Sequence, residues 1–125
     1  MVTADALSIS DAAQLTGLSA HTLRYYERAG LMLDPVERAP STHRRYSDAE
    51  IRWVTLLTRM RATGMPIRRI REYAELVRAG EGNEAERLAL LETHREAVLE
   101  QLDAMRRNLD AIDHKIELYR DRLGR

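Results

Sequence analysis

A short stretch near the N-terminus combines cationic and phenolic side chains at helical spacing. It covers residues 22–31 and reads TLRYYERAGL. Arg24 and Arg28 lie four residues apart, so a helix would place both on one face, with Tyr25 one step around it. A guanidinium can neutralise a phosphate or pair with guanine O6 and N7, and a tyrosine hydroxyl can donate to a phosphate oxygen. These three residues, with Thr22 beside them, predict a DNA-reading helix. Leu23 and Tyr26 of the same helix are expected in the core.

A second basic and aromatic cluster follows, in which residues 42–46 read THRRY. The candidate contacts there are His43, Arg44, Arg45 and Tyr46, and the alternative is a solvated basic turn next to a helix start. Arg68 is a further candidate, because it follows Pro66 at the expected start of a helix, where free N–H groups and the helix dipole favour phosphate.

The elements that must position these residues begin with two short helices. Ser10 is expected to cap a helix over residues 11–15, Gly17 supplies a turn, and Ser19 is expected to cap a helix from Ala20 to about Ala29. Two short helices that cross through a tight turn must bury a shared face, and this spacing therefore predicts a helix-turn-helix. The residues expected on that face are Ala12, Ala13, Leu15, Leu18 and Leu23.

The segment from Leu31 to Tyr46 contains two prolines and has no helical period, so we expect a hairpin or loop flanked by extended pieces. Ser47 stands three residues before Glu50, the spacing of a capping box, and should start a helix that ends at Gly64. A further amphipathic helix is expected after Pro66. Its apolar positions are Ile67, Ile70, Tyr73, Ala74 and Val77.

The last third of the chain carries a long apolar repeat. Gly80–Glu81–Gly82–Asn83 marks a boundary, and apolar residues then recur at alternating steps of three and four, which is typical of a coiled-coil seam. A single helix from Glu84 to Leu123 would be about 60 Å long at ~1.5 Å per residue and would need a partner helix. Packing back onto its own N-terminal part is the alternative, and the pattern does not distinguish a parallel from an antiparallel pair. Arg95 interrupts a seam that otherwise consists of Leu88, Leu91, Val98, Leu102, Met105, Leu109, Ile112, Ile116, Tyr119 and Leu123.

Charge and composition narrow the function. The net charge is zero, but residues 38–71 contain nine Arg and two acidic residues, whereas residues 81–125 contain eight basic and eleven acidic ones. A locally basic module can bind DNA whatever the total charge, although a solvated helical surface would show the same excess. The chain lacks Cys, and the isolated His94 and His114 have no metal-ligand spacing, so no metal or cofactor is expected.

No catalytic constellation is evident either, because the sequence shows no Ser-His-Asp set, phosphate-binding glycine loop or paired catalytic carboxylates. An enzyme is therefore not expected. No apolar run approaches about 18 residues and no signal-peptide pattern is present, which predicts a cytoplasmic protein without a membrane span.

Residues 22–31, the run Arg44–Arg45–Tyr46–Ser47 and the long C-terminal helix together resemble the MerR family of bacterial transcription regulators. The resemblance implies a mainly α fold: a winged helix-turn-helix DNA-binding domain over residues 1–80, then a linker and coiled-coil dimerisation helix over 81–125. It implies that Arg24 and Tyr25 contact the DNA backbone and major groove and that Arg45 and Tyr46 clamp phosphates. It also implies a homodimer with an antiparallel coil that binds a pseudo-palindromic operator on double-stranded DNA, and bends and untwists the promoter for RNA polymerase.

The departures from the family are also informative. Metal and redox branches place cysteines around the dimerisation helix, and this chain has none. Only Gly124 and Arg125 follow the expected coil, so an appended effector domain is not expected, and a small-molecule effector would have to bind near Tyr73, Leu76 or Leu88. The alternative function is a coiled-coil protein-interaction adaptor, or a heterodimerising partner subunit, without sequence-specific DNA binding.

Overall fold

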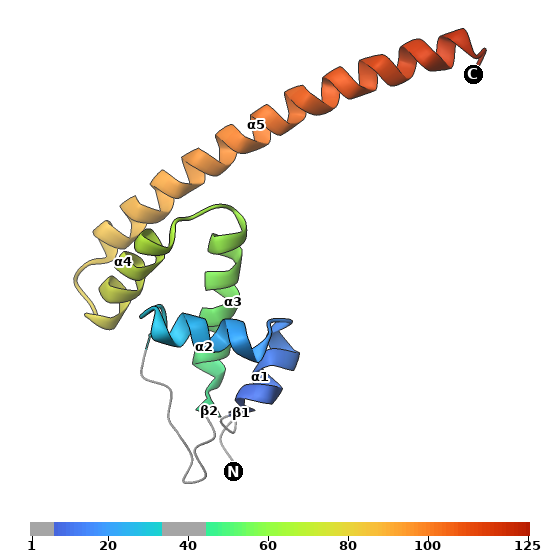
Figure 1. Cartoon of the computed structure of the whole chain (residues 1–125). Coiled ribbons are helices and arrows are strands. Elements are labelled where there is room, and N and C mark those ends of the chain that lie inside the picture. The colour runs from blue at the N-terminus through green and yellow to red at the C-terminus, as the bar shows by residue number, and fades with distance from the viewer. Residues whose placement is uncertain (1–6, 34–44) are drawn as a thin grey trace. The chain divides into compact units, whose positions relative to one another are not determined.

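The computed structural model describes residues 7–33 and 45–125 and is mainly helical in those ranges (Figure 1). The chain divides into two compact units, Met1–Leu90 and Leu91–Arg125, which we describe separately. In chain order the elements are β1 (Leu7–Ser8), α1 (Ile9–Thr16), α2 (Ala20–Arg28), β2 (Arg45–Tyr46), α3 (Asp48–Ala62), α4 (Ile67–Arg78) and α5 (Glu84–Arg122).

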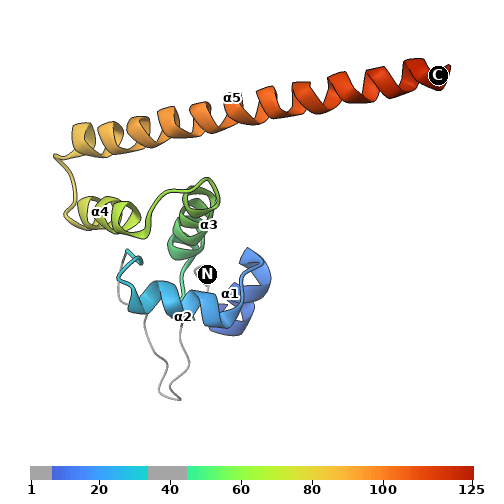
Figure 2. The ribbon, with the colours of Figure 1, turned by 45° about the horizontal axis from the view of Figure 1, so that its top comes forward.

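Helices α1 and α2 form the expected helix-turn-helix (Figure 2). Helix α2 is capped as predicted, because the Ser19 hydroxyl oxygen accepts a hydrogen bond from the Thr22 N–H at 3.0 Å. The predicted cap of α1 was wrong by two residues: Ser8, not Ser10, caps α1 by accepting from the Asp11 N–H at 3.1 Å. Ser8 can do this because β1 holds it in an extended conformation.

The face shared by α1 and α2 buries fewer residues than the spacing of apolar residues in the sequence predicted. Ala12 is the only fully buried residue of α1, and a small side chain there lets α1 approach α2 and α3 closely. Leu23 and Tyr26 are buried on α2, as expected. Leu15, expected on the same face, is 65% exposed because it lies off the side of α1 that centres on Ala12.

A minimal antiparallel sheet joins the start of the unit to α3. β1 pairs with β2, with Leu7 opposite Tyr46 and Ser8 opposite Arg45. The sequence indicated an extended piece before α3 but not its partner, which is the N-terminal segment Leu7–Ser8. The rest of the expected wing, residues 34–44, lies outside the described residues.

Helices α3 and α4 cover the helix-turn-helix and complete the core. The Ser47 hydroxyl oxygen accepts from the Glu50 N–H at 3.2 Å, which confirms the predicted start of α3. Leu56 is 41% exposed, because it lies off the face of α3 that carries Trp53, Val54, Leu57 and Met60. The core side chains outside the helix-turn-helix are Leu31, Met32, Tyr46, Trp53, Val54, Leu57, Met60, Met65, Ile70 and Ala74.

Helix α5 is one unbroken helix of 39 residues, Glu84–Arg122, so the predicted long helix is confirmed to within one residue. None of the helices in the described ranges combines the length and the apolar character that crossing a membrane requires.

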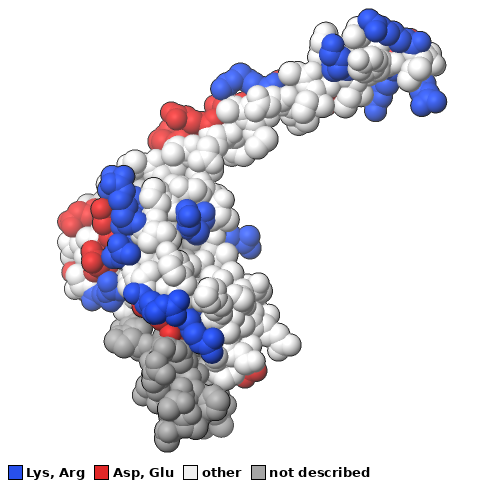
Figure 3. All heavy atoms as spheres, viewed as in Figure 1, with Lys and Arg blue, Asp and Glu red and all other residues white. Residues whose placement is uncertain are grey.

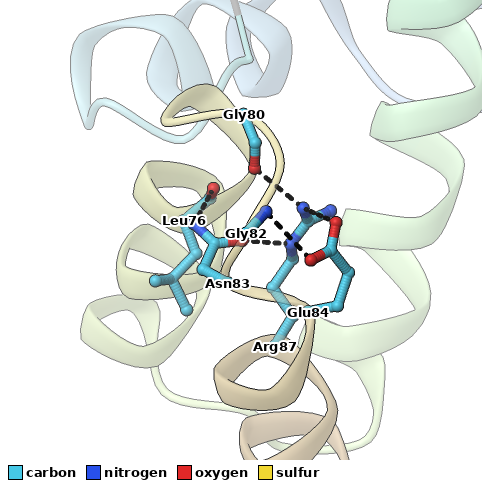
Figure 4. Close-up of polar contacts among 6 residues, drawn as sticks. All are labelled: Leu76, Gly80, Gly82, Asn83, Glu84 and Arg87. Carbon is cyan, nitrogen blue, oxygen red and sulfur yellow. Dashed lines mark hydrogen bonds and ion pairs between the residues drawn. The ribbon is translucent and has the colours of Figure 1, made fainter.

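The corner between α4 and α5 consists of Leu76, Gly80, Gly82, Asn83, Glu84 and Arg87, and polar contacts hold it together (Figure 4). The Asn83 side-chain amide donates to the Leu76 carbonyl at 2.7 Å, and the Arg87 guanidinium donates to the Gly80 carbonyl at 2.9 Å and to Asn83 Oδ1 at 2.7 Å. Hydrogen bonds from the N–H groups of Glu84 and Gly82 lower the pKa of the Glu84 carboxyl. The last turn of α4 is thus bonded to the first turn of α5.

The corner should contribute measurably to stability. Replacing Arg87 by Met keeps the apolar stem but removes its hydrogen bonds to Gly80 and Asn83, and we expect a loss of about 1–2 kcal/mol in the free energy of unfolding. Urea denaturation at one fixed protein concentration measures this loss. Arg120→Met is the matched control, since Arg120 makes one exposed ion pair with Glu117, worth at most about 0.5 kcal/mol. Equal midpoints for the two variants would show that the corner contributes nothing.

Candidate nucleic-acid interface

Helix α2 has a buried side and an exposed side, and the predicted DNA-reading residues lie on the exposed one. Arg24 and Arg28 are exposed, and Tyr25 is 42% exposed. Leu23 and Tyr26 fix the helix to the core from the opposite side. An Arg–Tyr–Arg surface on a helix anchored in this way can reach phosphates and base edges in a major groove.

Thr22 occupies the first turn of α2 and is only half-buried. Its N–H is already used by the Ser19 hydroxyl oxygen, and the Ser19 hydroxyl lies 3.0 Å from Thr22 Oγ1. The structure therefore places Thr22 in the cap of α2, from which its hydroxyl can still reach a ligand at the N-terminal end of the helix.

Basic side chains lie along α2 on the face of the unit Met1–Leu90 that Figure 3 shows, and basic and acidic side chains are mixed around α4. Arg68 is exposed in the first turn of α4, after Pro66, which provides no side-chain cap for that helix. Exposed arginines on α2 and at the start of α4 supply positive charge that phosphate binding requires. In the same unit, exposed Arg side chains are also present at Arg52, Arg59, Arg61, Arg69 and Arg78.

The second predicted cluster divides into two parts. The backbone of Arg45 lies in β2, whereas His43, Arg44 and the Arg45 side chain lie outside the described residues. The Tyr46 side chain is fully buried, and its hydroxyl donates to Glu27 of α2. Tyr46 therefore supports α2 from within the core, a burial that the sequence pattern did not indicate. We accordingly propose Arg45, and no longer Tyr46, as the phosphate contact of this pair.

Three side chains that sequence reasoning did not select hold the segment that follows α2. The Trp53 indole N–H donates to the Leu31 carbonyl at 2.7 Å. We define the α2 clamp as Arg71 and Arg78 of α4, which donate to the carbonyls of Ala29, Gly30 and Met32. Only the seven-residue spacing of the two arginines, which puts both on one face of α4, was visible in the sequence.

Within residues 7–33 and 45–125, no group of three or more His, Asp or Glu side chains could hold a metal ion. The chemistry that this surface offers is charge neutralisation and hydrogen bonding by Arg and Tyr. A helix-turn-helix with an exposed Arg–Tyr–Arg face and further exposed arginines around it is typical of DNA-binding proteins, and this places the protein in the class of helix-turn-helix DNA-binding proteins.

Comparison with known families agrees with this assignment. The model described as MerR HTH family regulatory protein matches residues 7–76, and the one described as MerR, DNA binding matches residues 51–115. The chain belongs to the MerR family, and the resemblance predicted from the sequence is confirmed. It is a MerR-type DNA-binding transcriptional regulator, and proteins of this family are regulators rather than enzymes.

Similar proteins extend over most of the chain. An uncharacterised HTH-type transcriptional regulator of Haemophilus influenzae is 36% identical over 86% of this chain and 79% of its own length. A putative MerR family transcriptional regulator from Listeria monocytogenes has a crystal structure that is 36% identical, with a TM-score of 0.85 over 90% of this chain and 85% of that one. HiNmlR is described as a MerR family regulator that lacks the sensor domain, and its crystal structure was solved bound to promoter DNA. It is 34% identical to this chain, with a TM-score of 0.82 over 93% of this chain and 91% of that one.

The exposed face of α2 should be required for operator binding. We expect Arg24→Ala to weaken binding to a selected operator duplex by about 10-fold, in the range of ~1–3 kcal/mol for one lost contact, and to lower the salt dependence if the contact is to phosphate. Fluorescence anisotropy at several salt concentrations measures both effects. Arg120→Ala on α5 changes the net charge equally and serves as control. If both variants bind alike, α2 does not read DNA through this face.

Proposed function

We propose that this regulator acts as a homodimer that binds the two halves of a pseudo-palindromic promoter operator. The observation that carries the proposal is the apolar seam of α5. Eight large seam side chains of this helix and its end are 41–67% exposed in the single chain. They are Leu88, Leu102, Met105, Leu109, Ile112, Ile116, Tyr119 and Leu123.

A continuous apolar stripe of this length favours a partner helix over solvent. Burying a fully exposed Leu, Ile or Met side chain contributes roughly 1.5–3 kcal/mol, so covering eight large side chains that are each about half exposed is a strong driving force for association. The remaining predicted dimerisation residues, Leu91 and Val98, are already half-buried in the single chain. The repeat of the seam matches the one that a second copy of α5 would present, which supports a homodimeric coiled coil.

The charges along α5 favour an antiparallel pair. Residues 84–103 contain six acidic and two basic residues, a net charge of −4, whereas residues 104–122 contain four acidic and five basic ones, a net charge of +1. A parallel pair would place the two acidic halves side by side, and an antiparallel pair would place each against the mildly basic half. This difference supports the antiparallel order that the family resemblance implies.

On DNA, the two α2 helices of such a dimer would enter successive major grooves, since two-fold symmetry of the protein maps onto an inverted repeat. Arg24, Tyr25, Arg28, Arg45 and Arg68 are the contacts we propose, with His43 and Arg44 as neighbours. HiNmlR, a relative of similar length, was solved bound to promoter DNA, which supports this use of the fold. Residues 1–80 would form the DNA-binding part and residues 81–125 the linker and dimerisation helix.

We further propose that the bound promoter is bent and untwisted, so that RNA polymerase can engage it. Deformation of DNA costs free energy that additional backbone contacts offset, and the basic side chains around α2 can provide such contacts. The adaptor hypothesis would require a protein ligand on the same surface, and the DNA-bound relative supports DNA in its place.

The order of the helices can be measured with spin labels, because the chain has no Cys of its own. Ala89→Cys and Ala104→Cys carry one label each, near the start and near the midpoint of α5, at positions outside the seam. In an antiparallel dimer that overlaps over its full length, labels at 89 lie about 40 Å apart, because 28 residues at ~1.5 Å separate them along the axis. Double electron–electron resonance measures that distance.

The midpoint label is the internal control. Labels at residue 104 lie within about 20 Å of each other in either order, given helix axes 8–10 Å apart at roughly central overlap. A short distance at residue 89 would establish a parallel coil and contradict the antiparallel proposal. The absence of dipolar coupling at both positions would contradict the dimer itself.

A further inference from the structure

We propose that Arg71 and Arg78 are positioning residues for DNA recognition, which set the place of α2 and of the segment that leaves it. The proposal rests on the proposed role of α2 as the reading helix. Both arginines donate to backbone carbonyls at the end of α2, so each would act through those carbonyls and not by binding DNA itself.

The contacts are long-range in sequence and converge on one short segment. Arg71 Nε donates to the Ala29 carbonyl at 2.9 Å in a partly buried position. Arg78 Nη1 donates to the Gly30 carbonyl at 3.3 Å and also to the Met32 carbonyl. Two side chains of α4 thus bind three of four consecutive carbonyls, and Trp53 binds the fourth, that of Leu31, at 2.7 Å.

Among the described residues, Trp53, Arg71 and Arg78 are the side chains that donate to those carbonyls at the end of α2. The helix closes on its own N–H groups: the Leu31 N–H donates to the Tyr26 carbonyl at 3.0 Å, and the Gly30 N–H donates to that of Glu27 at 3.3 Å. Gly30 allows this closure because its φ is +75°, a conformation that costs glycine little. The carbonyls beyond the closure carry the negative end of the helix dipole, which cations such as guanidinium stabilise.

The position of α2 matters more for specific than for non-specific DNA binding. Arg24 and Arg28 contribute charge wherever they point, and charge alone carries most non-specific affinity. Base readout needs a side chain in register with a base edge, so a displaced α2 forfeits specific contacts first. Loss of the α2 clamp should therefore lower specific affinity selectively, an effect that simple loss of folded protein would not produce.

The test uses the full chain and the variants Arg71→Met, Arg78→Met and the double variant, which keep an apolar stem without the guanidinium. Affinity is measured for a selected operator duplex and for a scrambled duplex of equal length and composition. We expect the double variant to lose about 10-fold in specific affinity and less than about 3-fold in non-specific affinity, at unchanged dimerisation. Arg71→Lys keeps one donor for the Ala29 carbonyl and should recover part of the specific affinity.

Arg61→Met is the matched control, because Arg61 also donates from its guanidinium to a carbonyl, that of Met65 at 3.3 Å, but not to the end of α2. A specificity ratio in the double variant equal to that of Arg61→Met would overturn the proposal. An equal fall in affinity for both duplexes would show a structural role and overturn the proposal as well. If the double variant does not fold, the same comparison of specific and non-specific affinity is made with the lysine variants at both positions. Arg24→Ala separates the two hypotheses, since a normal operator affinity there would instead refute α2 as the reading helix.

Discussion

The hydrogen bond from the Trp53 indole to the Leu31 carbonyl fixes the end of α2 to α3, and the rest of the DNA-binding unit depends on this contact. It connects the centre of α3 to the point where the chain leaves α2, within a core that includes Leu31, Met32 and Leu57. A buried carbonyl without a donor would cost about 1–3 kcal/mol, so the single Trp of the chain satisfies a requirement that an aliphatic residue would leave unmet. Tyr73 stacks on the same indole, with ring centroids 5.6 Å apart, and brings α4 to the same place.

From this point, polar contacts continue through α4 to the start of α5. Arg71 and Arg78 connect α4 to the end of α2, and Asn83 connects the Leu76 carbonyl of α4 to the first turn of α5. All of these contacts lie within the unit Met1–Leu90, which therefore includes the first two turns of the long helix. In the proposed dimer, these hydrogen bonds would connect each reading helix, through α4, to the first turn of α5 of the same chain.

The sequence predicted the features that depend on neighbouring residues. Ser19 and Ser47 were identified as caps, and the extent of α5 was predicted to within one residue, because capping and heptad spacing are local patterns. The errors arose where a distant partner decides the structure. Ser8 caps α1 because β1 pairs with β2, and Leu15 is exposed because α1 packs through Ala12. Tyr46 looked like a phosphate ligand, but its partner Glu27 lies 19 residues earlier, and no spacing rule could find that pair.

The measurement that tests the central claim most directly is selection of bound duplexes from a random DNA pool by the purified protein at about physiological salt, followed by sequencing. The account predicts enrichment of an inverted repeat with a fixed distance between half-sites, since a two-fold symmetric dimer presents two identical α2 helices. Enrichment of single half-sites, or of no sequence at all, from a protein that is still folded and dimeric would contradict it.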